Sequence, residues 1–104
     1  MRGGNMKNMM KQMQKMQKEM VESQNELEKR TFTGVANDDL ITIEMNGKRD
    51  VLAVNVKEDI AERGDAEFLE DLITIALKDV LTKVEEETEQ TMGKYTQNLN
   101  IPGF

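Results

Sequence analysis

The stretch from Met6 to Leu27 places the strongest constraint on how this chain can fold. Apolar side chains recur in it at alternating steps of three and four residues, and those at the two core positions of a heptad repeat are Met6, Met9, Met13, Met16, Met20 and Leu27. At about 100° of turn per residue, these side chains share one face of an α-helix. No proline or glycine interrupts the stretch, so it predicts a helix over residues 6–30 whose apolar seam packs against another helix.

The same helix carries a basic face opposite the seam. Four lysines, which we call the lysine stripe, lie within about 80° of one another there: Lys7, Lys11, Lys15 and Lys18. The chain has a formal net charge of −6, yet residues 1–18 contain no acidic residue. One reading is the solvated back of a coiled coil, but such a face usually mixes glutamate with lysine. A stripe of a single sign suits contact with phosphate, which supplies affinity without reading base sequence.

The methionines also allow a metal hypothesis, because thioethers are soft ligands that suit Cu(I). Every seam position falls in one heptad register, which favours helix packing, so we expect no metal site. Catalysis finds no support either, because the chain has no histidine, no cysteine, one serine (Ser23) and no glycine-rich phosphate loop. The carboxylates of Glu85–Glu89 fit a solvated helix face better than a buried acid pair. We therefore expect a protein that is not an enzyme and takes no cofactor or small-molecule substrate.

After residue 30 the apolar pattern changes to a period of two, which is typical of strands. Three alternating runs follow, over residues 31–36, 40–45 and 49–57. Asn46-Gly47 between the last two runs is a strong hairpin signal. Gly34 inside the first run indicates either a bulge or a close backbone approach. Residues 31–57 therefore predict a three-stranded antiparallel meander.

A second helix is predicted over residues 65–92, after a polar loop, with Gly93 ending it and residues 93–104 forming a tail. The first half of this helix is apolar over a wider arc than three short strands can cover. We therefore expect a second copy of the chain to cover the rest, in a two-fold homodimer. The positions expected at its interface are Leu69, Leu72, Ile73, Ala76, Leu77 and Val80.

The 104 residues are predicted to form one α+β domain, in which two long helices flank the sheet and residues 1–5 are a flexible lead-in. The longest uncharged apolar-rich run, Leu72–Leu77, is far shorter than the roughly 20 residues that span a membrane. The lack of cysteine fits a reducing cytosol. We expect a cytoplasmic protein that does not enter membranes.

Several short motifs occur in an order that resembles a known family. They are Met9-Met10-Lys11-Gln12-Met13-Gln14-Lys15-Met16-Gln17, Thr33-Gly34, Asn46-Gly47-Lys48, Phe68-Leu69-Glu70-Asp71-Leu72-Ile73, Met92-Gly93-Lys94 and Ile101-Pro102-Gly103-Phe104. Together they resemble the YbaB/EbfC family of bacterial nucleoid-associated proteins. The resemblance implies an α-β-β-β-α protomer and a dimer whose helices project like tweezers and bind duplex DNA. Two loops depart from the family: Asn37-Asp38-Asp39 stands in place of a glycine-rich run, and residues 58–65 lack the usual proline.

These observations predict a dimeric nucleoid-associated protein that binds double-stranded DNA mainly through phosphates, helps to organise the nucleoid and can influence gene expression. The basic residues expected at the DNA are Arg2, Lys7, Lys11, Lys15, Lys18, Lys83 and Lys94. The alternative is a coiled-coil interaction module or chaperone-like adaptor that grips proteins with the methionine seam. If the two helices run antiparallel, the acidic run Glu85–Glu89 is expected near the lysine-bearing start of the first helix, where it competes with phosphate.

Overall fold

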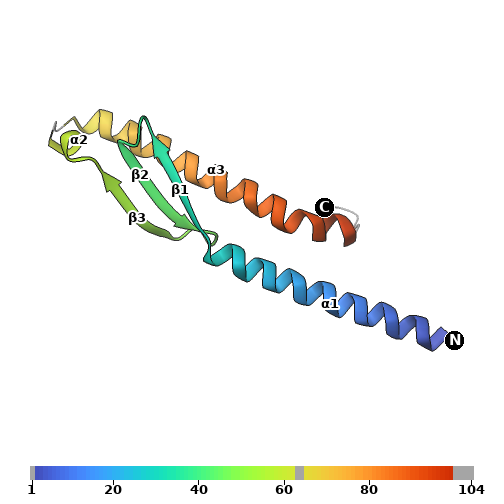
Figure 1. Cartoon of the computed structure of the whole chain (residues 1–104). Coiled ribbons are helices and arrows are strands. Elements are labelled where there is room, and N and C mark those ends of the chain that lie inside the picture. The colour runs from blue at the N-terminus through green and yellow to red at the C-terminus, as the bar shows by residue number, and fades with distance from the viewer. Residues whose placement is uncertain (1, 63–64, 100–104) are drawn as a thin grey trace.

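The computed structural model describes residues 2–62 and 65–99 of the chain. In chain order the elements are α1 (Arg2–Lys29), β1 (Thr31–Ala36), β2 (Ile41–Asn46), β3 (Val51–Val56), α2 (Glu58–Glu62) and α3 (Ala66–Leu99). Figure 1 shows α3 lying along the sheet and α1 extending away from it. The order confirms the predicted α+β fold, to which the structure adds the short helix α2.

The sheet is the predicted antiparallel meander, with strands in the order β1-β2-β3. On β2 the alternation buries every second side chain, and those at most 2% exposed are Ile41, Ile43 and Met45. The Asn46-Gly47 signal correctly marks the β2–β3 connection. A bulge after this connection inserts Leu52 opposite the Glu44–Met45 step of β2.

Helix α3 packs its apolar stripe against β1 and β2. The stripe repeats every four residues, and its side chains are at most 1% exposed: Leu72, Ala76, Val80 and Val84. The helix comes so close to β1 that a Cβ on Gly34 would lie 2.3 Å from the Ala76 carbonyl oxygen and 2.6 Å from Val80 Cβ. The register of β1 against β2 is regular at Gly34, so close backbone approach, and not a bulge, explains this glycine.

Polar side chains of α3 bond to the outer edge of β1. Asp79 Oδ2 accepts the backbone N–H of Val35 at 2.9 Å, and Lys83 Nζ donates to the Thr33 carbonyl oxygen at 2.8 Å. Asp79 and Lys83 also form an ion pair with each other at 3.1 Å. The Val35 amide, and after it Lys83, lowers the pKa of Asp79, so the fold favours the charged carboxylate. We refer to β1 as the sealed edge of the sheet.

Both long helices extend further than predicted. Helix α1 begins at Arg2, so residues 2–5 of the predicted lead-in are helical. Helix α3 continues to Leu99, and the prediction that Gly93 ends it is wrong. A glycine inside a helix costs about 1 kcal/mol relative to alanine, and the burial of Tyr95, which is 5% exposed, offsets that cost. Residues 100–104 of the predicted tail lie outside the described residues.

The turn between β1 and β2 holds three successive side-chain-bearing residues in the left-handed region, since Asn37, Asp38 and Asp39 have φ angles of 34°, 54° and 63°. The left-handed conformation costs a residue with a Cβ about 1–2 kcal/mol.

Asp38→Gly should therefore raise the free energy of unfolding by about 0.5–1 kcal/mol in urea denaturation. The control, Asp71→Gly on the exposed side of α3, should lower it by roughly 0.3 kcal/mol, the difference in helix propensity between aspartate and glycine. Equal losses in the two variants would contradict this prediction.

Candidate nucleic-acid interface

Helices α1 and α3 run antiparallel, and two polar contacts join them. Ser23 Oγ and Tyr95 Oη are hydrogen-bonded at 2.9 Å. Arg30 Nη1, in the residue that follows α1, pairs with Glu87 Oε1 at 2.6 Å. As the chain advances in α1 from Ser23 to Arg30, the partner in α3 moves back from Tyr95 to Glu87. The two helices therefore run antiparallel, which is the condition set in the sequence analysis for the position of the acidic run.

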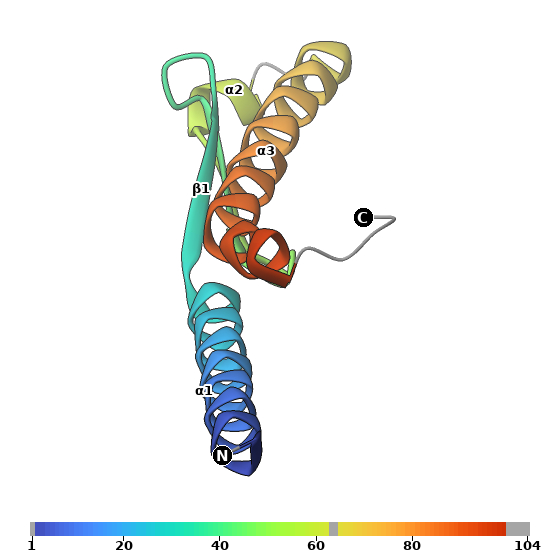
Figure 2. The same ribbon diagram turned by 90° about the vertical axis from the view of Figure 1, so that its right-hand side faces the viewer.

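The start of α1 projects beyond α3. Continuing the antiparallel pairing past Tyr95 brings Leu99, the last described residue of α3, about level with Glu19. Residues 2–18 therefore extend beyond the described part of α3, and we call this segment the arm. Figures 1 and 2 show the arm pointing away from the sheet, and the molecule measures 75 × 25 × 17 Å. Apart from the half-buried Met16, residues 5–18 of the arm are all exposed.

The lysine stripe lies on the arm. Lys7, Lys11, Lys15 and Lys18 are all exposed. Because Ser23 and the buried Leu27 face α3 and the sheet, helical turn places the stripe on the opposite side of α1. Within the described part of the chain the ion pairs are Arg30–Glu87 and Lys83–Asp79, so no stripe lysine has an acidic partner there. Arg2 is the first residue of the same helix.

The acidic run Glu85–Glu89 does not lie beside the stripe, and that expectation is wrong. Its member Glu87 pairs with Arg30, at the end of α1 that leads into the sheet. The helices are antiparallel as assumed, but α3 continues well past the acidic run to Leu99. The acidic run therefore lies beside the end of α1 that leads into the sheet, whereas the stripe lies nearer the other end of α1. No described glutamate of this run competes with an anion for the arm.

The sequence also predicts two lysines of α3 at the DNA, and the structure places them far apart on that helix. Lys83 is held between Asp79 and the Thr33 carbonyl on the sealed edge, away from the arm. Lys94 is exposed, next to the Ser23–Tyr95 contact, with its Nζ 5.0 Å from the centroid of the Tyr95 ring. Of these two lysines, only Lys94 therefore lies near α1, from which the arm projects.

Sequence reasoning missed two further cations, Lys29 and Lys48. Lys29 follows Lys18 by eleven residues, close to three helical turns, and so continues the face of the stripe. Lys29 and Lys48 line one shallow cleft at the end of α1, together with Asn25, Glu28, Asn46, Asp50 and Leu52. Two carboxylates, Glu28 and Asp50, balance the two cations in this cleft, whereas the stripe contains lysines alone.

The methionine seam is covered over only part of its length. Leu27 is buried at 5% exposure, and Met16 and Met20 are half-buried. On the arm the seam is open, with Met6, Met9 and Met13 between 62% and 65% exposed. Helix α3 is thus the predicted partner for the part of the seam nearest the sheet, whereas the described residues of this chain leave Met6, Met9 and Met13 uncovered.

The six positions expected at a dimer interface fall into two groups. Leu72, Ala76 and Val80 are at most 1% exposed because they pack under the chain's own sheet. Leu69 is half-buried against the same core. Ile73 and Leu77 are each 36% exposed and remain on the surface. A second copy can therefore contact Ile73 and Leu77. The other positions, Leu72, Ala76 and Val80, are already enclosed within the chain.

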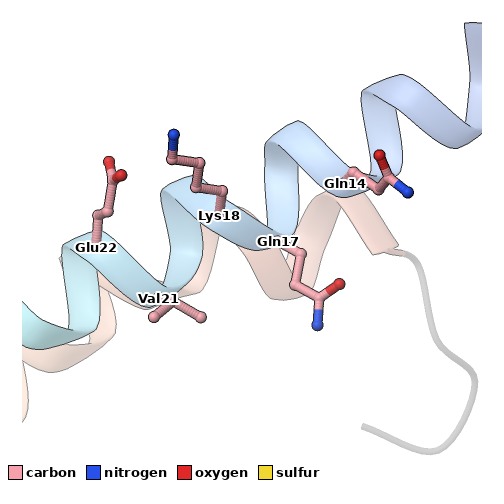
Figure 3. A pocket seen from close by; sticks show the side chains of 5 residues that line it. All are labelled: Gln14, Gln17, Lys18, Val21 and Glu22. Carbon is pink, nitrogen blue, oxygen red and sulfur yellow. The ribbon is translucent and has the colours of Figure 1, made fainter.

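A shallow hollow on α1 is lined by Gln14, Gln17, Lys18, Val21 and Glu22. Figure 3 shows Lys18 and Glu22 rising from one side of the helix, with Gln17 and Val21 on the other.

No cluster of three or more metal-ligating side chains occurs in residues 2–62 or 65–99, counting His, Cys, Asp and Glu. None of the described helices is both long and apolar enough to cross a membrane.

Comparison with known proteins finds relatives over the full length of the chain. A nucleoid-associated protein of Listeria monocytogenes is 52% identical over 105 residues, which cover 100% of both chains. A nucleoid-associated protein of Enterococcus faecalis is 47% identical over 105 residues, covering 100% of this chain and 99% of that protein. The nucleoid-associated protein OB0030 of Oceanobacillus iheyensis is 45% identical over 101 residues, covering 97% of each.

A solved structure shares the fold. The crystal structure of the uncharacterized protein HP0035 from Helicobacter pylori matches with a TM-score of 0.71 at 17% identity, covering 85% of this chain and 92% of that one. The family model described as "YbaB/EbfC DNA-binding family" matches residues 2–99. The resemblance drawn from the motifs is thereby confirmed. The chain belongs to the YbaB/EbfC DNA-binding family.

Proposed function

We propose that this chain binds double-stranded DNA in the nucleoid of the bacterial cytoplasm, as a homodimer that grips the phosphate backbone with the lysine stripe. The observation that carries the proposal is an exposed stripe of four lysines on an arm that projects from an otherwise acidic molecule. The names of its relatives as nucleoid-associated proteins support the location. Holding DNA in this way would organise the nucleoid and influence the expression of the genes it covers.

The chemistry of the arm supports contact with phosphate over contact with bases. Lys7 and Lys18 are eleven residues apart, about 16 Å along a helix, which is long enough to follow several phosphates. No aromatic residue occurs in α1, so the arm has no ring on which a base could stack. Lysine at phosphate acts as a point charge without base readout. We therefore infer binding with little sequence preference.

The surface that we propose for the dimer is the part of the sheet that α3 leaves open. In Figure 1 β3 is the strand furthest from α3. Its apolar side chains Leu52, Val54 and Val56 are 53%, 51% and 36% exposed. On α3, helical turn sets Ile73 and Leu77 on the flank opposite Asp79, which contacts β1, and so towards β3. These five side chains form one apolar surface, called here the open face, that a second copy would bury.

The edges of the sheet support the same surface. The Lys57 N–H donates to the Leu40 carbonyl at 3.1 Å. Because bonded and non-bonded pairs alternate in an antiparallel ladder, the backbone amides and carbonyls of Val54 and Val56 then point to the outer edge of β3. Identical strands can pair antiparallel there about a two-fold axis. The β1 edge is sealed by Asp79 and Lys83, so we assign the contact to β3.

Sedimentation tests the dimer with two matched variants. Leu77→Asp places a charge on the open face and should convert the dimer to monomer at micromolar concentration. Val35→Asp is the control, because Val35 is exposed to the same degree, 37% against 36%, but lies on the sealed edge. It should remain dimeric. A wild-type monomer, or loss of the dimer in both variants, would contradict the assignment.

Fluorescence anisotropy tests DNA binding directly. A short mixed-sequence duplex should bind the wild-type protein at low salt, and affinity should fall steeply between roughly 50 and 200 mM salt. A second duplex of unrelated sequence should bind with similar affinity. Absence of binding at low salt would refute the proposal and would favour the alternative, in which the exposed methionines of the arm grip a protein.

A further inference from the structure

The direction of the arm depends on contacts at its base. A single residue, Arg30, separates α1 from β1, so no linker absorbs a change of angle. Arg30 pairs with Glu87 of α3 at 2.6 Å, and its guanidinium carbon lies 5.2 Å from the centroid of the Phe32 ring. The preceding turn is fixed by Leu27, which is 5% exposed. These contacts anchor one point of α1 to the body of the molecule.

One anchored point still allows α1 to pivot, and the Ser23–Tyr95 hydrogen bond supplies a second point. Ser23 is seven residues before Arg30, about 10 Å along the helix. The two hydroxyl oxygens are 2.9 Å apart, and Tyr95 is 5% exposed. Ser23 also occupies a seam position where the heptad pattern asks for an apolar residue. A polar pair within an apolar seam fixes the register of two helices, because slipping would leave both hydroxyls unpaired.

We propose that Ser23 and Tyr95 are positioning residues that hold the arm at a set angle and rotation, so that the lysine stripe is already oriented when DNA arrives. The inference rests on the proposed function for its effect on DNA. It adds a reason for the extension of α3 past Gly93, because without that extension Tyr95 could not reach α1. Holding a binding surface in its bound orientation improves affinity by removing the ordering cost from the binding step.

Distances between two spin labels test the positioning without DNA. The chain has no cysteine, so Gln12→Cys on the arm and Lys78→Cys on the exposed side of α3 give two labelled sites, and excess unlabelled protein suppresses distances between copies. The parent should give a narrow distance distribution. Tyr95→Phe, which removes only the hydroxyl, should broaden it, and so should Ser23→Ala. Ser23→Thr keeps a hydroxyl and should restore the narrow distribution.

Affinity for the same mixed-sequence duplex gives the second readout. Tyr95→Phe should weaken binding about fivefold, the value of one hydrogen bond, without changing the salt dependence, because every lysine remains. The double variant with Ser23→Ala should be no weaker than Tyr95→Phe alone. Thr74→Ala is the matched control: it removes a hydroxyl that bonds only to the Glu70 carbonyl within α3, and it should leave both readouts unchanged.

An unchanged distance distribution in Tyr95→Phe would overturn the inference, as would an equal loss of affinity in Thr74→Ala. If the wild-type protein binds no DNA, the proposed function fails, and the label distances alone decide whether Ser23 and Tyr95 hold the arm.

Discussion

Gly34→Ala should lower the free energy of unfolding by about 3 kcal/mol or more. The new Cβ would lie 2.3 Å from the Ala76 carbonyl oxygen and 2.6 Å from both the amide nitrogen and the Cβ of Val80. Two of these atoms belong to the α3 backbone, so no flexible side chain can move aside. Relief requires α3 to shift away from β1, which loosens the buried contacts of Leu72 as well.

The chain supplies a control with the same chemical change. Gly93 lies in α3 with nothing within 4 Å of its added Cβ, so Gly93→Ala should raise the free energy of unfolding by about 1 kcal/mol through helix propensity. Urea denaturation of both variants measures the difference. A Gly34→Ala variant as stable as the wild type would mean that α3 does not approach β1 as described.

The second large effect concerns DNA affinity. Two copies offer eight stripe lysines, which set an upper salt slope of roughly −7 for log K against log salt, and about −4 if half of them reach phosphate. Changing all four stripe lysines to glutamine should flatten that slope towards zero. It should also weaken binding roughly thousand-fold at about 0.1 M salt, since each lost contact forfeits the release of one condensed counterion. The four positions are Lys7, Lys11, Lys15 and Lys18.

If the arm contacts DNA, removing the same positive charge from another part of the protein should not cause the same loss of affinity. The double variant Lys7→Gln and Lys11→Gln is therefore compared with Lys57→Gln and Lys78→Gln, which removes the same charge from exposed positions outside α1. Only the arm variant should flatten the salt slope. Equal slopes in the two double variants would make the stripe a solvated helix face. Circular dichroism and sedimentation should be unchanged in both, because these lysines are exposed.

Local patterns in the sequence account for most of the fold. The period of two places Ile41, Ile43 and Met45 on one face, and the structure buries all three. The end of α3 could not be read in this way. A glycine signals a helix end through its local conformational freedom, whereas at Gly93 a partner distant in sequence, Ser23, holds the following turn through Tyr95. Such a contact has no local signature.

The candidate site, like the fold, could be predicted from local spacing only in part. Helical spacing is enough to put the stripe lysines on one face of α1. Whether a given lysine is available depends on contacts between elements, and Lys83 is occupied by a strand fifty residues earlier in the chain. The positions expected at a dimer interface could be predicted only in part for a similar reason. Spacing marks the apolar arc of α3, but only the position of the sheet decides that Leu72 is enclosed and Leu77 is left at the surface.

The sealed edge of β1 also bears on how large an assembly of this protein can become. A sheet with both edges available can accept a strand on each side, so edge-to-edge association continues into an open-ended filament. Here the Val35 amide and the Thr33 carbonyl are already bonded to Asp79 and Lys83 of α3. A strand adding at β1 would have to replace these two bonds, whereas β3 needs no such exchange, and two copies joined at β3 as proposed would cover that edge. In the proposed dimer, the ion pair on α3 would thus favour closed pairs of chains over open-ended filaments.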